Sequence, residues 1–322
     1  MKDITPDCDF MISKAKVLTG YKWHPNSYGS QNPVFLPNEI EEIGFRAMLH
    51  FICPRLVMPR SLKVIRLEAF ALAHIDEIDF NGCNLLTIDC DAFVGCKAKT
   101  TLPDSVRHIE SKAIQELELK KGEKLRLPSS LNYIGRQAID LRGLRILEVE
   151  EAMVTQQSGL EELIVNTYDL NKEGLILYVR RNGKLIFRVP FSFYYGYIKP
   201  GTPFISEKGI NYSFYDEWFS ISSDRQLKSM IAAFRFMFTE GLTAEAIKKY
   251  KKYASSNFPA LIDGFEEDIE VIKLYDDAGI ISVNRLKQLL ENASKKNNVE
   301  AAAGILELMN RREGSTVKSL RL

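Results

Sequence analysis

The chain has 322 residues, of which 45% are hydrophobic and 26% are charged, and this composition is typical of globular proteins. Its 43 lysines and arginines nearly balance its 42 aspartates and glutamates, so no net field attracts nucleic acid or an anionic membrane. No apolar run approaches the roughly 18 residues of a membrane-spanning helix, so the sequence predicts no membrane segment.

The N-terminal segment and the cysteines indicate a compartment. The first residues, MKDITPDCDF, are acidic where a signal peptide needs a cationic start and an unbroken apolar run. The chain has five cysteines, an odd number, and no CxxC pair, so neither a disulfide framework nor a zinc knuckle is indicated. We therefore expect a cytoplasmic protein.

A sequence frame recurs through the first half of the chain. The segments 35–48, 57–70, 101–114 and 126–139 each have Leu or Met followed by Pro at their second and third positions and end with Ala followed by a large apolar residue; a copy at 85–93 lacks the proline. The framework isoleucines are Ile43, Ile65, Ile88, Ile109 and Ile134. Their spacing falls within the period of leucine-rich repeats, roughly 20 to 29 residues, and predicts a solenoid of stacked repeats.

Each repeat also contains a short strand pattern in which apolar residues alternate with other residues. It occurs at 53–58, 75–80, 122–127, 144–149 and 160–165, and more weakly at 97–102. Because side chains alternate between the two faces of a strand, one set is expected to point into the core. That set comprises Leu56, Met58, Ile78, Phe80, Leu125, Leu127, Leu147 and Val149.

From about Val34 to Val165 the frame LPxSVxxIGxxAFxxCxxLxxIxLP resembles BspA-type leucine-rich repeats. Residues 10–40, with VLTGY, resemble the hairpin that precedes the first such repeat. Ala113-Ile114 and Ala138-Ile139 depart from the Ala-Phe pair of the pattern but keep apolar volume. The resemblance implies a capping hairpin at 1–33 and about six repeats of short parallel strands at 34–166. It also implies protein interaction rather than a defined reaction.

The second half changes character. Two strand-like runs at 175–191 flank Asn182-Gly183, which predicts a hairpin that caps the open end of the solenoid. Residues 167–221 are expected to form this cap and a linker. Helical periodicity begins at Asp224, with Thr243 and Ser282 as further helix N-caps and Gly279 as a helix end. Residues 222–313 are expected to form an all-α domain of helical hairpins, and residues 314–322 a flexible tail; the fold class is α+β.

The helical domain resembles the ankyrin-like helical tails found after BspA-type repeats in some bacterial proteins. That likeness rests on its final two helices and the KKNNVEAAAGILEL junction between them.

No catalytic signature stands out. The sequence has no HExxH, Walker A or GxGxxG motif, and no nucleophile beside a base, so we expect neither an enzyme nor a cofactor. Cys83, Cys90 and Cys96 lie in one repeat, and buried small hydrophobes are a better interpretation than a metal site. The four histidines are expected to have structural roles.

The outward positions of the predicted strands form the candidate partner-binding surface. They are Arg55, Glu77, Asp79, Lys99, Lys124, Arg126, Ile146, Glu148, Glu162 and Ile164. A ladder of mixed charge with embedded isoleucines suits a protein partner better than nucleic acid. The leading hypothesis is therefore a bacterial or phage-type adaptor that binds a protein through this sheet, through the helical tail, or through both.

Two alternatives stay open. The run KKYKKY at 248–253 combines lysine and tyrosine as nucleic-acid binders do, although its tyrosines suit a core and its lysines a solvated helix face. A regulatory protein that associates with nucleic acid through the helical domain is therefore one alternative. A surface adhesin, as other BspA-type proteins are, is the second.

Overall fold

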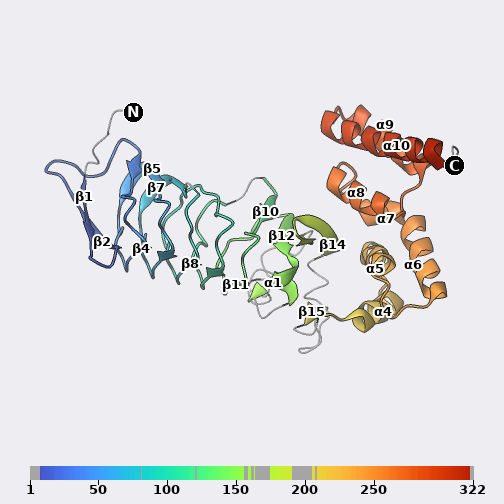
Figure 1. Cartoon of the computed structure of the whole chain (residues 1–322), viewed down its shortest axis with the longest axis horizontal. Helices are drawn as coiled ribbons and strands as arrows, with labels where there is room; N and C mark the ends of the chain where they lie inside the picture. The colour runs from blue at the N-terminus through green and yellow to red at the C-terminus, as the bar shows by residue number, and fades with distance from the viewer. Residues whose placement is uncertain are drawn as a thin grey trace. The chain divides into compact units, whose positions relative to one another are not determined.

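The computed structural model describes residues 8–80, 82–119, 122–155, 159–160, 163, 175–190, 205–206 and 209–319. The chain divides into two compact units (Figure 1), the first formed mainly by residues up to Gly183 and the second mainly by residues from Lys184 onward. No helix among the described residues is both long enough and apolar enough to cross a membrane.

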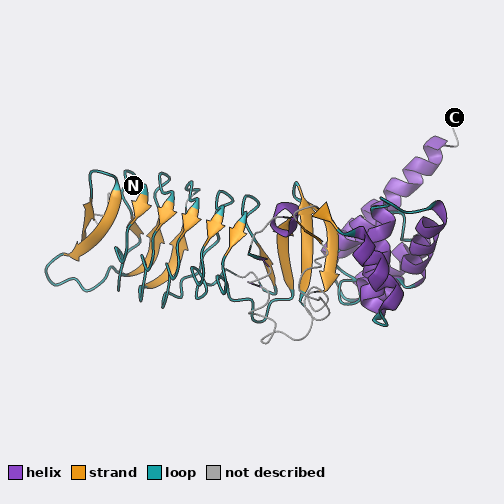
Figure 2. Cartoon of the chain, turned by 90° about the horizontal axis from the view of Figure 1, so that it is seen from below, coloured by secondary structure: helices purple, strands orange, loops and turns teal. Residues whose placement is uncertain are grey.

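The first unit begins with an antiparallel hairpin. Its strands are β1 (Cys8–Ile12) and β2 (Val17–Trp23), and β2 starts a ladder of parallel two-residue strands. The seven-stranded sheet has the order β1-β2-β4-β6-β8-β9-β11. Its short strands are β4 (Glu42–Ile43), β6 (Val64–Ile65), β8 (Thr87–Ile88), β9 (His108–Ile109) and β11 (Tyr133–Ile134). Each repeat adds one of them, so the repeats stack in chain order (Figure 2).

Each repeat also contributes to a second group of parallel strands. One sheet contains β3 (Val34–Phe35), β5 (Ile52–Val57) and β7 (His74–Asp79), and another contains β10 (Lys124–Arg126), β12 (Ile146–Glu150) and β13 (Ile176–Arg181). Between them, the weak strand predicted at 97–102 is reduced to Lys99, which bridges to Glu77 and Glu118. The other strands predicted between 53 and 149 are confirmed to within two residues. The solenoid architecture is therefore the predicted one.

The core of the first unit is a set of aligned apolar columns. All five framework isoleucines are fully buried, and so are the eight residues predicted to face inward. The rings of Phe70 and Phe93, which come from successive repeats, stack with their centroids 4.8 Å apart. Burial of identical positions in register explains why the frame recurs, because each repeat covers the apolar face of the one before it.

A left-handed residue precedes the frame alanine in every repeat. These residues have φ between 50° and 57°, which is costly for any residue other than glycine. They are Arg46, Glu68, Asp91, Lys112 and Gln137. Hydrogen bonds to the next repeat follow at once: Met48 N donates to Ala69 O at 2.8 Å, and Phe70 N donates to Ala92 O at 2.8 Å. Stacking therefore stabilises a turn that the residues alone disfavour.

Serine side chains also join successive repeats. The serine two residues after the frame proline places its hydroxyl beside two backbone carbonyls of the preceding repeat, and a hydroxyl can donate its hydrogen to either oxygen. The serines are Ser61 (Asn38 O and Ile40 O), Ser105 (Cys83 O and Leu85 O) and Ser130 (Asp104 O and Val106 O). This contact explains why the frame contains serine rather than another small residue.

One strand prediction is wrong. Leu160 and Leu163 lie in helical backbone rather than in a strand at 160–165, and both are buried. Residues three apart share one face of a helix, so helical backbone buries both leucines together. They follow the short helix α1 (Glu151–Thr155). Two residues of the candidate surface, Glu162 and Ile164, lie outside the described residues.

The second unit is mainly helical. The turn between β13 and β14 (Lys184–Pro190) has positive φ at both Asn182 and Gly183, as the predicted hairpin turn requires. Two short strands follow, β15 (Ile205–Ser206) and β16 (Gly209–Ile210). The helices are α4 (Tyr212–Ile221), α5 (Arg225–Met237), α6 (Ala244–Ser256), α7 (Phe258–Ile262), α8 (Ile269–Asp277), α9 (Val283–Lys295) and α10 (Val299–Ser319).

The predicted helix caps are confirmed, whereas α4 lies in the stretch predicted as a linker and α10 continues into the predicted tail. The side chains of Asp224, Thr243 and Ser282 each accept a hydrogen bond from the backbone N–H three residues later, as N-cap residues do. Gly279, with a φ of 66°, follows the end of α8. These caps satisfy backbone groups that a helix leaves unpaired at its ends.

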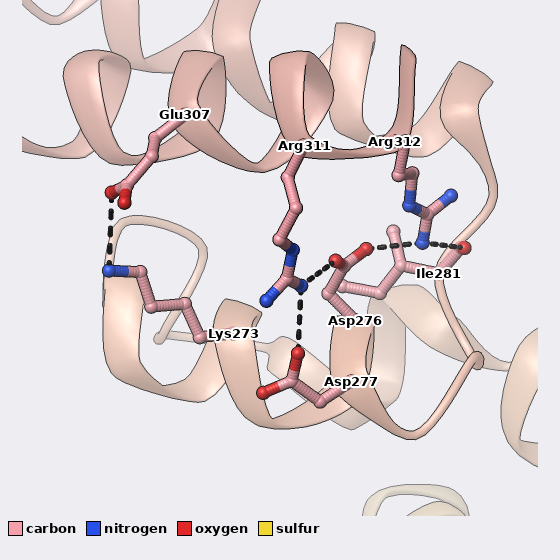
Figure 3. A network of polar contacts seen from close by, with 7 residues as sticks. All are labelled: Lys273, Asp276, Asp277, Ile281, Glu307, Arg311 and Arg312. Carbon is pink, nitrogen blue, oxygen red and sulfur yellow. Dashed lines mark hydrogen bonds and ion pairs between the residues drawn. The ribbon is translucent and has the colours of Figure 1, made fainter. Parts of the chain in front are cut away.

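Buried ion pairs hold the helices together. Arg235 is fully buried on α5, and its guanidinium donates to both carboxylate oxygens of Asp216 on α4 at 2.8 and 3.2 Å. Figure 3 shows a second network, in which the buried carboxylate of Asp276 on α8 receives hydrogen bonds from Arg311 and Arg312 on α10. A buried charge is tolerated only when it is paired, so both networks fix the packing of neighbouring helices.

Candidate partner-binding surface of the repeat sheet

Three residues of the predicted surface meet in one groove. Glu77 and Asp79 on β7 and Lys99 in the next repeat line a hollow of about 370 Å³. The other lining residues are Ile78, Phe80, Thr100, Thr101, Glu118 and Leu119. The groove exists because parallel strands place equivalent outward positions of successive repeats side by side.

Charges at the groove are only partly paired. Arg55 on β5 lies 2.6 Å from Asp79 and 3.6 Å from Glu77, and the hydrogen bond to Asp79 raises the pKa of Arg55. Lys99 is flanked in the ladder by Glu77 and Glu118, but it makes no ion pair with any described residue. Among the residues that the structure describes, three carboxylates therefore face two cations at the groove.

The predicted surface residues around β12 do not belong to the groove. Glu148 was expected to point outward into solvent, but its side chain is only 3% exposed. It accepts hydrogen bonds from Arg180 at 2.8 and 3.1 Å and is also paired with Lys124. Glu148 is thus buried and does not belong to an outward surface, whereas Lys124 pairs with it and keeps its own side chain exposed.

Strand β13 is the reason why Glu148 is buried. It pairs with β12 in parallel register and places Tyr178 opposite Glu148 and Arg180 opposite Glu150, so the sheet continues where the sequence predicted only a cap. Arg126 lies 3.8 Å from Glu150, and Ile146 is half-buried. Outward residues at this end of the sheet therefore contact one another.

The ion pairs shift the pKa of Glu148. Burial alone raises the pKa of a carboxyl, but the hydrogen bonds from Arg180 and Lys124 outweigh burial and hold the pKa of Glu148 below its ordinary value. A carboxyl with a lowered pKa stabilises the folded state at neutral pH. That contribution is lost as the pH falls below the ordinary pKa of a glutamate and through the lowered one.

We expect Glu148→Gln to lower the free energy of unfolding by about 3 kcal/mol at pH 7, because it leaves Arg180 buried without a counter-charge. At pH 3 the gap between variant and wild type is expected to shrink, since the glutamate of the unfolded wild-type chain is protonated there while the folded state resists protonation. Urea unfolding at both pH values measures this. Glu123→Gln is the control, because Glu123 is exposed and lies 4.0 Å from Arg145. A gap of equal size at pH 3 and pH 7 would contradict the ion-pair assignment.

Four of the five cysteines are buried and serve as packing residues. Burial raises the pKa of Cys53 to about 12 and that of Cys96 to about 11, so both thiols stay protonated at neutral pH. All five cysteines are free. In the part of the chain that the structure describes, no three His, Cys, Asp or Glu side chains are placed to hold a metal ion.

A second groove was missed by the sequence analysis. It lies on the seven-stranded sheet, has a volume of about 530 Å³, and is lined by Phe45 and Leu67, which are 55% and 41% exposed. Both residues occupy the second position after the framework isoleucine, where later repeats carry Cys90, Ser111 and Arg136. Two apolar residues at this otherwise more polar position were the signal from which the sequence could have predicted the groove.

The described repeats form a solenoid whose open surfaces are sheets. Comparison with known proteins makes the class specific: residues 27–145 match the model of the BspA type leucine rich repeat region in six copies. This part of the chain therefore consists of BspA-type leucine-rich repeats, as the recurring frame predicted. Repeats of this family are typically non-enzymatic scaffolds.

Solved structures include distant likenesses to this chain, and the pneumococcal vaccine antigen PcpA is one of them. The crystal structure of the pneumococcal vaccine antigen PcpA is 18% identical, with a TM-score of 0.36, over 46% of this chain and 49% of that chain. The chain thus spans about half the length of that structure. No curated protein matches the sequence.

Proposed function

We propose that this chain is a non-catalytic adaptor that binds a protein partner through the groove on its repeat sheet. The observation that carries the proposal is the groove of Glu77, Asp79, Lys99 and Glu118. It collects charged side chains beside the half-buried Leu119, while Ile78 and Phe80 line it with their backbone and are themselves buried in the core. Apolar contacts with a polar rim are typical of protein interfaces.

The charge of the groove favours a protein over nucleic acid. Among the described residues its three carboxylates outnumber the cations Arg55 and Lys99, and phosphate groups are repelled by such a surface. A protein segment with lysine or arginine beside an apolar side chain complements both the carboxylates and Leu119. Electrostatic complementarity of this kind sets specificity and association rate.

Two further parts of the proposal concern the cellular location and the arrangement of the helical unit. We place the adaptor in the cytoplasm, because all five of its cysteines are free, and four of those thiols are buried. Helix α10 packs against both α8 and α9, which supports an ankyrin-like arrangement. Fractionation of the native cell tests the location: recovery of the protein at the cell surface would favour the adhesin alternative.

The test of the proposed function is affinity capture with the full chain, followed by a binding assay with the captured protein. We expect the double reversal Glu77→Lys with Asp79→Lys to weaken binding at least tenfold while the melting temperature stays within a few degrees. The matched control is Glu39→Lys with Glu300→Lys, since both glutamates are exposed and make no ion pair with any described residue.

Two results would contradict the proposal. One is equal binding by the groove variant and the control. The other is loss of binding only when residues 222–313 are deleted, which would place recognition in the helical unit and make the repeats a scaffold.

A further inference from the structure

Helix α6 carries an unusual concentration of unpaired positive charge. Lys248, Lys249, Lys251 and Lys252 are all exposed, and none lies within ion-pair distance of a carboxylate among the described residues. Several exposed cations elsewhere in the chain are paired instead: Lys16 and Lys63, for example, both pair with Glu41. The charge on α6 is therefore available to a partner.

A fifth lysine from a neighbouring helix adds to this surface. Lys228 on α5 lies 5.0 Å from the ring centre of Phe219, and Lys249 on α6 lies 5.8 Å from the same ring. Lys251 lies 5.0 Å from the ring of Phe236. We define the lysine face as Lys228, Lys248, Lys249, Lys251 and Lys252. Cation–π contacts hold three of its five ammonium groups in place, which reduces the entropy lost when an anion binds.

The aromatic rings beside the lysines are not free to stack on nucleic-acid bases. Phe219 is 5% exposed, and its ring packs edge-on against Tyr250 at 4.7 Å and Tyr253 at 5.1 Å. Single-stranded nucleic acid is bound by rings that offer an open face, so this arrangement disfavours it. The tyrosines of the KKYKKY run serve the core, as the sequence suggested.

The charge of the whole helical segment also disfavours duplex nucleic acid. Residues 210–322 contain 16 basic and 16 acidic residues, so no net positive field surrounds the lysine face. Duplex binding relies on a broad basic footprint, whereas a short acidic segment needs only a local one. The observations favour carboxylates presented by a protein.

We propose that the lysine face binds an acidic segment of a protein partner, one with several Asp or Glu residues in close succession. Lys248 and Lys252 are four residues apart and share one side of the helix, so they can contact neighbouring carboxylates of one segment. This site is separate from the repeat groove. Either proposal can fail without affecting the other.

The test is fluorescence anisotropy with the full chain and a labelled ten-residue polyglutamate peptide at 0.15 M salt. The variant is Lys248→Gln with Lys252→Gln, which keeps good helix formers. Its matched control is Lys97→Gln with Lys287→Gln, since both are exposed lysines without an ion pair among the described residues. We expect the variant to bind the peptide about fivefold to tenfold more weakly and the control to bind as wild type does.

Three results would overturn the proposal. They are no measurable binding of the peptide by the wild type, an equal loss in variant and control, and tighter binding of a 20-nucleotide single strand or duplex than of the peptide. The last result would identify the lysine face as a nucleic-acid surface instead.

Discussion

Ile65→Asp is expected to unfold the repeat unit at temperatures where the wild type is fully folded. Ile65 is completely buried and lies in parallel register between Ile43 and Ile88, so aspartate there removes an aliphatic contact and places an unpaired charge in the core. Each effect costs several kcal/mol against a total stability of roughly 5 to 15 kcal/mol for a domain. Circular dichroism at increasing temperature measures the loss.

Lys97→Asp is the matched control for this substitution. Lys97 is exposed and makes no ion pair with any described residue, so the melting temperature of the Lys97→Asp variant is expected to stay within a few degrees of wild type. Lys124 is unsuitable for this purpose because it pairs with the buried Glu148. Similar melting losses at positions 65 and 97 would mean that the framework isoleucines are not the core.

Gly135→Ala is expected to destabilise the repeat unit by about 3 kcal/mol. A Cβ atom on Gly135 would lie 2.4 Å from the backbone nitrogen of Ser111 and 2.7 Å from the carbonyl carbon of Glu110. Both atoms belong to the backbone of the preceding repeat, so the clash is relieved only when two repeats move apart. Urea unfolding measures the effect.

Gly122→Ala separates this steric effect from backbone strain. Gly122 has a φ of 66° but has open space around the position of a Cβ, so alanine there costs only the left-handed conformation, about 1 to 2 kcal/mol. Gly135 does not have a positive φ, so the whole destabilisation by Gly135→Ala comes from the steric clash. A smaller loss for Gly135→Ala than for Gly122→Ala would contradict the close stacking of the last repeats.

The sequence predicted the repeat unit well because its signal is periodic. The framework isoleucines, the frame prolines and the strand alternation all recur in register, and stacking buries the same position in every repeat. The prediction failed at 160–165, outside the repeating frame. There Leu160 and Leu163 fit a strand pattern and a helix face equally well.

The candidate surface was predicted only in part, for a physical reason. The alternation of apolar and polar residues along a strand predicts which side chains point away from the core. It does not predict which of those side chains a later strand will contact. Glu77, Asp79 and Lys99 form an open groove, whereas Glu148 is enclosed by Arg180 from a strand thirty residues downstream. The groove at Phe45 and Leu67 was missed because apolar residues are read as core unless their neighbours show otherwise.

The most direct test of recognition by the repeat groove is photo-crosslinking in the native cell. A photoreactive phenylalanine analogue replaces Thr101, which is exposed and lines the groove, and in a second variant it replaces exposed Lys97, which does not line it. We predict one discrete protein adduct from position 101 and none from position 97. No adduct from position 101, together with an adduct from the same probe at Lys248 on α6, would contradict recognition by the groove and place it in the helical unit.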